Sequence, residues 1–157
     1  MELQVRSLFI AFSVVLATAT DGHCDWQYTQ WGSSPDAVLK ASGGAAQLNG
    51  NRGKDPAQMK AKLVAPYRAG SNSYLAYFIF DQTDKLSIVD LEMQSGSCPQ
   101  AVFELTSAYG PPQDRGSFGL KKWWDTKNSN IVIYTDEGSG CTVRYLPLVA
   151  AGKPGGL

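Results

Sequence analysis

The pattern of hydrophobic and polar positions predicts two short helices. Residues 33–44 read SSPDAVLKASGG and residues 97–112 read SCPQAVFELTSAYGPP, so both stretches place a proline shortly before Ala-Val and later reach a glycine. A small polar residue followed by proline is typical of a helix start, and glycine is typical of a helix end. The helices are therefore predicted to begin at Pro35 and Pro99 and to end before the glycines.

The remaining stretches show the two-residue alternation or the dense apolar runs that are typical of strands. Residues 74–81 (YLAYFIFD) and 85–93 (KLSIVDLEM) form the clearest pair, because a short polar turn joins them. Residues 57–70 are ambiguous between helix and strand, and we interpret them as a strand that Pro66 ends. Three further strands are predicted within residues 120–126, 130–136 and 141–148.

This order of elements predicts an α+β fold, an antiparallel β-meander with two short helices packed on one face. Parallel pairing needs long crossovers, which hairpin-length connections do not provide. Helix and three strands occur twice, which suggests a tandem α-β-β-β repeat. The alternative is that the helix-opening phrase arose twice because proline is common at helix starts. The uncovered face of such a sheet is left for solvent or for a partner.

The beginning of the chain predicts export. The apolar run of residues 8–19 is shorter than the roughly 20 residues that span a bilayer, but it suits a secretory signal. Ala17-Thr18-Ala19 supplies a cleavage site. We predict a signal peptide over residues 1–19, a single α+β domain over 20–148, a flexible tail over 149–157, and secretion into a bacterial periplasm. An uncleaved membrane anchor is the alternative.

Export changes the interpretation of the three cysteines, Cys24, Cys98 and Cys141. In an oxidising compartment they should give one disulfide and one remaining thiol. Three pairings are possible, and we favour Cys98–Cys141 because both residues lie inside predicted structured segments. Cys24 is a weak candidate for lipidation, because residues 21–23 (DGH) are not the small or apolar residues that precede a lipidated cysteine.

Charge and composition exclude several classes of protein. Lys+Arg and Asp+Glu both number 14, so the chain lacks the basic field that nucleic acids or anionic membranes require. No integral span is expected once the signal is removed. His23 is the only histidine, so the sequence offers neither a Ser-His-Asp or Cys-His catalytic set nor a zinc site. We expect no cofactor and no metal; the oligomeric state stays open.

Four carboxylates around one predicted hairpin are the remaining candidates for catalysis: Asp81, Asp84, Asp90 and Glu92. Paired carboxylates of this kind would suit a small hydrolase acting on cell-wall or glycan substrates. Asp81 and Asp84, however, are typical turn residues, and Asp90 and Glu92 fit the polar face of a strand. We therefore favour a protein that is not an enzyme and keep the hydrolase as the alternative.

Aromatic residues give the stronger indication of function. Trp123 and Trp124 are adjacent, and neighbours on a strand point to opposite faces, so one should enter the core and the other should remain outside. Tyr77 and Tyr134 lie on other predicted strands. Because Trp and Tyr dominate binding hot spots, we predict a binding surface among these four residues. The alternative is that another segment covers them.

The stretch WGSSPDAV ahead of a meander, and AYGPP ahead of tryptophan-rich strands, resemble small exported bacterial proteins. The chain resembles the beta-lactamase-inhibitor-protein-like group and the small outer-membrane-assembly lipoproteins that share its helix-plus-sheet module. It is also similar to uncharacterised periplasmic families. The resemblance covers residues 26–148 as a pattern of elements and implies protein binding through a sheet face, without catalysis. The missing lipobox separates the chain from the lipoprotein branch.

We therefore predict a secreted, non-enzymatic binding module that engages a protein or an envelope component through an exposed aromatic sheet face. An envelope structural or stress protein without a specific ligand is a further alternative.

Overall fold

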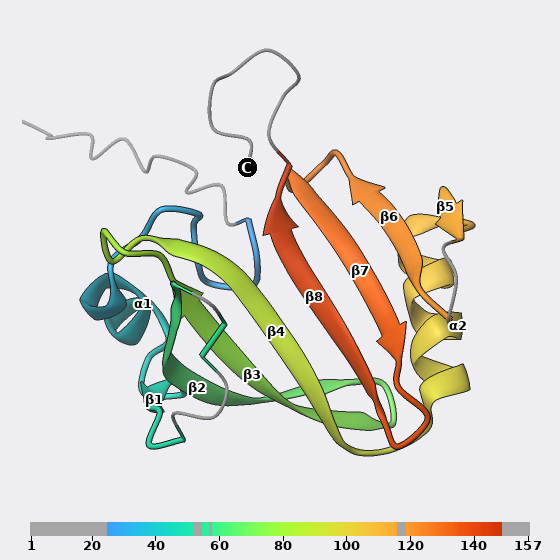
Figure 1. The fold of residues 1–157 in the computed structure, drawn as a ribbon, viewed down its shortest axis with the longest axis horizontal. Coiled ribbons are helices and arrows are strands. Elements are labelled where there is room, and N and C mark those ends of the chain that lie inside the picture. Colours follow the sequence, from blue (N-terminus) through green and yellow to red (C-terminus); the bar gives the residue numbers. More distant parts are fainter. Residues whose placement is uncertain (1–24, 52–54, 57, 116–118, 149–157) are drawn as a thin grey trace, which may run out of the picture.

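The computed structural model describes residues 25–51, 55–56, 58–115 and 119–148. The predicted signal peptide, His23, Cys24 and the predicted C-terminal tail lie outside the described residues. Within them, two helices and eight strands form the fold shown in Figure 1. The elements are α1 (Pro35–Ala41), β1 (Gln47–Leu48), β2 (Lys60–Ala69), β3 (Asn72–Phe80), β4 (Leu86–Ser95), α2 (Cys98–Tyr109), β5 (Asp114–Arg115), β6 (Lys121–Asp125), β7 (Asn130–Asp136) and β8 (Cys141–Pro147).

The strands form one antiparallel sheet in the order β1-β2-β3-β4-β8-β7-β6-β5. This confirms the α+β class and the meander. The first half of the chain runs α1-β1-β2-β3-β4 and the second runs α2-β5-β6-β7-β8, so the element order occurs twice, as a tandem repeat requires. The halves meet where β4 pairs with β8 (Figure 1), which we call the seam. The two-residue strands β1 and β5 were not predicted, because two positions are too few to show a period.

The helix ends confirm the signals in the sequence. Pro35 opens α1, and the Ser34 hydroxyl accepts a hydrogen bond from the Ala37 amide at 3.3 Å, as an N-cap should. In α2 the capping residue, Ser97, makes no such side-chain bond; its amide instead donates to Asn72 Oδ1 at 2.8 Å. Gly110 ends α2 with φ of 79°, a conformation that glycine adopts without strain.

Pro66 does not end its strand as predicted. Strand β2 continues to Ala69, and Pro66 is paired with Leu75 of β3. Proline lacks an N–H, so a strand accepts it only where no neighbour needs that donor. The short strand β1 pairs with β2 only at residues 63–64, which leaves the edge of β2 beside Pro66 unpaired within the described residues.

Both helices pack on one face of the sheet, which we call the inner face. Val38 of α1 and Ala101 and Leu105 of α2 are buried in the same cluster as the inner side chains of the strands. In both helices described by the structure, the length is too short to cross a membrane. The strand residues of the core are Leu63, Ala65, Tyr74, Ala76, Phe78, Phe80, Leu86, Val89, Leu91, Trp123, Val132, Tyr134, Cys141, Val143 and Tyr145.

The outer face of the sheet is not uniformly bare. Ala61, Val64, Tyr77, Ile79 and Ile88 form a second, smaller cluster over β2, β3 and β4. The reason is visible in β3, whose run YFIF has no polar residue at alternate positions and therefore presents apolar side chains to both faces.

The segment before α1 is attached to the second half of the chain. The Asn130 Nδ2 group donates to the Asp25 carbonyl at 2.6 Å, and the Trp31 indole donates to Asn130 Oδ1 at 2.9 Å. Trp26 packs its ring 5.6 Å from that of Phe78 and 6.0 Å from that of Tyr145, measured between centroids. This segment therefore ties residues of both halves together on the inner face.

Cys98 and Cys141 lie at disulfide distance, with Cα atoms 5.8 Å apart, which is the pairing that the sequence favoured. The bridge joins the first residue of α2 to the first residue of β8. It thereby holds the start of α2 against the strand that forms the seam.

Replacing both cysteines, in Cys98→Ser/Cys141→Ser, should lower the free energy of unfolding by up to about 4 kcal/mol, because the bridge closes a span of 43 residues. Urea denaturation followed by circular dichroism measures the change. A reductant should destabilise the wild type and leave the double variant unaffected. An unchanged midpoint for the reduced wild type would contradict the prediction.

Candidate binding groove

The structure separates the two adjacent tryptophans, as strand alternation predicts. Trp123 is 0% exposed on the inner face, and its indole donates to the Gly110 carbonyl at 2.9 Å. Trp124 lies on the outer face, 37% exposed, with Lys122 Nζ 5.0 Å from its ring centroid. Of the two, only Trp124 exposes its ring at the surface.

The other two predicted binding residues do not join Trp124. Tyr134 is 2% exposed in the inner core, and Tyr77 is 6% exposed in the outer cluster of β2–β4. The four residues are thus divided between two faces and two halves, which corrects the prediction of one exposed surface. The physical reason is that Trp123 and Tyr134 share the inward positions of β6 and β7, whereas Tyr77 belongs to a strand that is apolar on both faces.

The carboxylates of the β3–β4 hairpin have structural contacts. Asp81 Oδ1 accepts hydrogen bonds from the amides of Thr83 and Lys85 at 2.8 and 3.0 Å, and the Lys85 bond is the main cause of the lowered pKa of Asp81. Asp84 pairs with Lys62 at 2.5 Å.

Further along β4, Asp90 pairs with Arg144 at 2.6 Å. Glu92 lies two positions later on the same outer side of the strand. The contacts of Asp81 are thus those of a turn, and the contact of Asp90 is a cross-strand ion pair.

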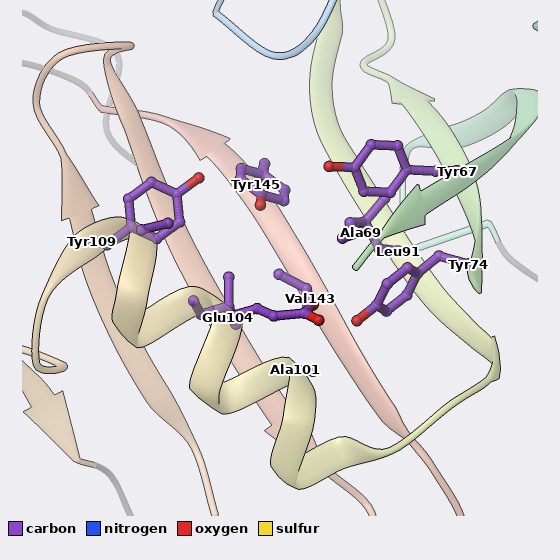
Figure 2. A pocket seen from close by; sticks show the side chains of 11 residues that line it. Tyr67, Ala69, Tyr74, Leu91, Ala101, Glu104, Tyr109, Val143 and Tyr145 are labelled. Carbon is purple, nitrogen blue, oxygen red and sulfur yellow. The ribbon is translucent and has the colours of Figure 1, made fainter. Parts of the chain in front are cut away.

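A groove opens on the inner face at the seam (Figure 2). Its first hollow has a volume of about 140 Å³. The floor comes from β4 and β8, one wall from α2, and the opposite wall from the β2–β3 hairpin. The residues that line it are Tyr67, Ala69, Tyr74, Leu91, Ala101, Glu104, Leu105, Ala108, Tyr109, Val143 and Tyr145.

Four tyrosines define this hollow. Tyr67 and Tyr74 are cross-strand partners in the hairpin, with ring centroids 6.1 Å apart, and Figure 2 shows both hydroxyls pointing across the groove toward α2. From the other side, the hydroxyls of Tyr145 and Tyr109 are hydrogen-bonded to each other. The groove therefore combines flat aromatic surfaces with hydroxyl groups that can still form hydrogen bonds.

Glu104 closes one end of the hollow. Its carboxylate accepts hydrogen bonds from Gln100 Nε2 at 3.3 Å and from Asn72 Nδ2 at 3.5 Å. It lies directly over Gly70 in the hairpin turn, where any Cβ atom would overlap Glu104 Oε1. The φ of Gly70 is 52°, in the left-handed region that favours glycine, so glycine suits this turn and leaves room for the Glu104 carboxylate in its present position.

A second hollow, of about 230 Å³, continues the groove and shares Tyr67, Tyr109 and Tyr145 with the first. Its polar end holds Asp125, which is 7% exposed. The Asp125 carboxylate accepts bonds from the Asn128 amide at 3.1 Å and from the Asn128 side chain at 2.7 Å. We call the two hollows together the tyrosine groove.

Burial is the main cause of the raised pKa values of the groove tyrosines, and the pKa of Tyr145 lies well above its ordinary value. The Glu104 carboxylate further raises the pKa of Tyr67, and the Asp125 carboxylate further raises that of Tyr109. All four phenols therefore stay protonated at neutral pH. They can stack and form hydrogen bonds, but they do not supply a base.

The polar side chains that line the groove are phenols, carboxylates and side-chain amides. Among the described residues that line the two hollows there is no Ser, Cys or His to form a nucleophile–base pair. In the same described ranges, no three His, Cys, Asp or Glu side chains are arranged to hold a metal ion.

The sequence contained only part of the signal for this site. Tyr67 and Tyr74 are inward residues on either side of the Gly70-Ser71 turn, but Tyr109 and Glu104 on α2 and Tyr145 on β8 come from distant segments. Comparison with known protein families, curated proteins and solved structures finds no match to this chain.

Trp123→Ala should lower the free energy of unfolding by about 3–5 kcal/mol, because it empties a fully buried site and leaves the Gly110 carbonyl without its donor. Trp124→Ala, the matched change on the next residue, should cost less than about 1 kcal/mol. Chemical denaturation of both variants measures the difference. Equal losses would contradict the placement of the two rings.

Stability should fall as the pH rises from 10 toward 12. Burial, and next the Asp136 carboxylate, raise the pKa of Tyr134 to about 12, so the folded state keeps a proton that the unfolded state loses above pH 10. The free energy of unfolding of Tyr134→Phe should therefore fall less steeply over this interval than that of the wild type. Lysine titration is common to both proteins, so the difference in slope isolates Tyr134. Parallel slopes would refute the assignment.

Proposed function

We propose that this protein is a non-enzymatic binding module that takes a segment of another protein into the tyrosine groove. The observation that carries the proposal is an open groove at the seam, lined by four tyrosines from four different elements of both halves. Tyrosine supplies a large, rigid contact surface at little conformational cost, and it is among the residues that dominate binding hot spots.

The size of the hollows favours side chains of a protein segment over a small-molecule ligand. Small-molecule sites usually measure about 300–1,000 Å³. The first hollow has about 140 Å³ and the second about 230 Å³. A cavity of about 150 Å³ holds a single benzene, so each hollow suits about one side chain. Because the hollows share three tyrosines, an extended segment could place one side chain in each.

Export and the family resemblance fit this proposal. A signal peptide over residues 1–19 would deliver the chain to an oxidising compartment, where the Cys98–Cys141 pair would persist as a disulfide. The resemblance to the beta-lactamase-inhibitor-protein-like group likewise implies protein binding, there through a sheet face. We place the site in the groove because Trp123 and Tyr134 are buried.

The variant Ala108→Trp should block the groove, because Ala108 is an exposed residue of α2 that lines the first hollow. Peptides selected from a random displayed library on the wild type should bind this variant at least tenfold more weakly. Titration calorimetry measures the affinities, and NMR shifts of backbone amides locate the contact. The expected shifts lie on α2, the β2–β3 hairpin and β8.

Ser107→Trp is the matched control, since it adds the same ring at the neighbouring exposed position outside the groove lining. Its affinities should stay within twofold of the wild type. If the selected peptides bound Ala108→Trp undiminished, or shifted residues around Trp124 instead, the groove would not be the binding site.

A further inference from the structure

The charges along the tyrosine groove all have one sign. Its lining includes Glu104 at one end and Asp25 and Asp125 at the other. No Lys, Arg or His is present among the described residues that line either hollow. The outer face near the seam differs, because Lys122 and Arg144 lie there on β6 and β8. A chain with a formal net charge of zero thus carries a locally negative groove.

Neither Glu104 nor Asp125 is neutralised from within the described part of the chain. The hydrogen-bond donors that reach Glu104 are the side-chain amides of Asn72 and Gln100. Those that reach Asp125 are the Asn128 amide and the side chains of Asn128 and Asn130. Amide groups orient a carboxylate without cancelling its charge, so both charges act on whatever occupies the groove.

The negative charges of the groove favour a cationic ligand, and the aromatic lining favours a cation as well. A cation over the face of a tyrosine ring is attracted by the ring quadrupole, and the attraction is larger when the cation is desolvated. The phenol oxygen of Tyr74 points into the groove beside Glu104, and that of Tyr67 points into it on the side of Tyr145 (Figure 2). Such oxygens are acceptors for N–H donors, as the bond from Gln27 Nε2 to the Tyr67 oxygen at 3.4 Å illustrates. Carboxylates, ring faces and phenol oxygens together match an ammonium or guanidinium group.

We propose, on the basis of the proposed function, that the tyrosine groove selects a partner segment through its basic side chains, a lysine or arginine entering between Glu104 and the tyrosines. A segment is preferred to a free amine because each hollow accommodates about one side chain and the two are contiguous. A second basic residue of the segment can then approach Asp125.

The test uses four matched peptides of the form acetyl-Gly-Ala-X-Ala-X-Ala-Gly-amide, with X as Arg, Lys, Gln or Glu, and arginine amide as the free cation. Each is titrated into the full-length exported protein at low salt, with NMR shifts and calorimetry as readouts. The Arg and Lys peptides should bind at least tenfold more tightly than the Gln peptide and shift amides around Glu104, Tyr109 and Tyr145. Added salt should weaken this binding.

Glu104→Gln tests the charge itself, because glutamine keeps an oxygen that can accept from Asn72 and Gln100. This variant should bind the Arg peptide about three- to tenfold more weakly than the wild type does, and it should bind the Gln peptide with unchanged affinity. Asp36→Asn removes one negative charge from an exposed position of α1 and should change neither affinity by more than twofold. The comparison among peptides on the wild type stands even if a variant fails to fold.

The outcomes separate the two proposals. Equal binding of the Gln and Arg peptides in the groove, or preference for Glu, would overturn the basic ligand while the binding function stands. Arginine amide binding as tightly as the Arg peptide would overturn the choice of a segment. If neither these peptides nor library-selected ones shift groove residues, the groove is not a binding site and the proposed function fails with it.

Discussion

The antiparallel pairing of β4 with β8 is the constraint on which the rest of the structure depends. Four residue pairs, from Val89–Tyr145 to Glu92–Thr142, join two four-stranded halves into one sheet. Each half alone would bury a single short helix against a small sheet, and domains of that size bury a smaller fraction of their surface and are only marginally stable. The seam therefore creates the shared core, and its residues Leu91, Val143 and Tyr145 also form the floor of the groove.

The groove is where this core remains incomplete. The start of α2 and Glu104 contact the β2–β3 hairpin at Asn72 and Gly70, and beyond these contacts the tyrosines cover the core without filling the space above it. Their hydroxyls need partners, which Tyr109 and Tyr145 find in each other. Glu104 and Asp125, at the two ends of the groove, accept hydrogen bonds from amide groups and have no cationic partner among the described residues.

Local physics made much of the fold predictable. Proline before Ala-Val marked both helix starts, and alternation opposed Trp123 to Trp124. Alternation could not say which of the two is inward, because that depends on where the helices pack. Nor could it show that Pro66 sits on an unpaired edge, since the register of β1 settles that.

The groove could not be predicted from the sequence for a related reason. It needs β4 and β8 side by side, although Asp90 and Arg144, which pair across the seam, are 54 residues apart in the chain. Tyr67 and Tyr74 of the β2–β3 hairpin there share a groove with Tyr109 and Tyr145, which come from the other half of the chain. The sequence pointed to aromatic residues as the candidate binding surface, but the fold buries three of the four that were selected, Tyr77, Trp123 and Tyr134.

The two walls of the groove belong to different halves of the chain, and this has a mechanical consequence. Neighbouring strands of a sheet are rotated by roughly 20–25° relative to each other, and the angle varies with local conditions. A small change of this rotation between β4 and β8 would move α2 relative to the tip of the β2–β3 hairpin. The width of the groove between them would change with it. The Cys98–Cys141 bridge joins α2 to β8 within one half, so the start of α2 would follow β8 in such a change.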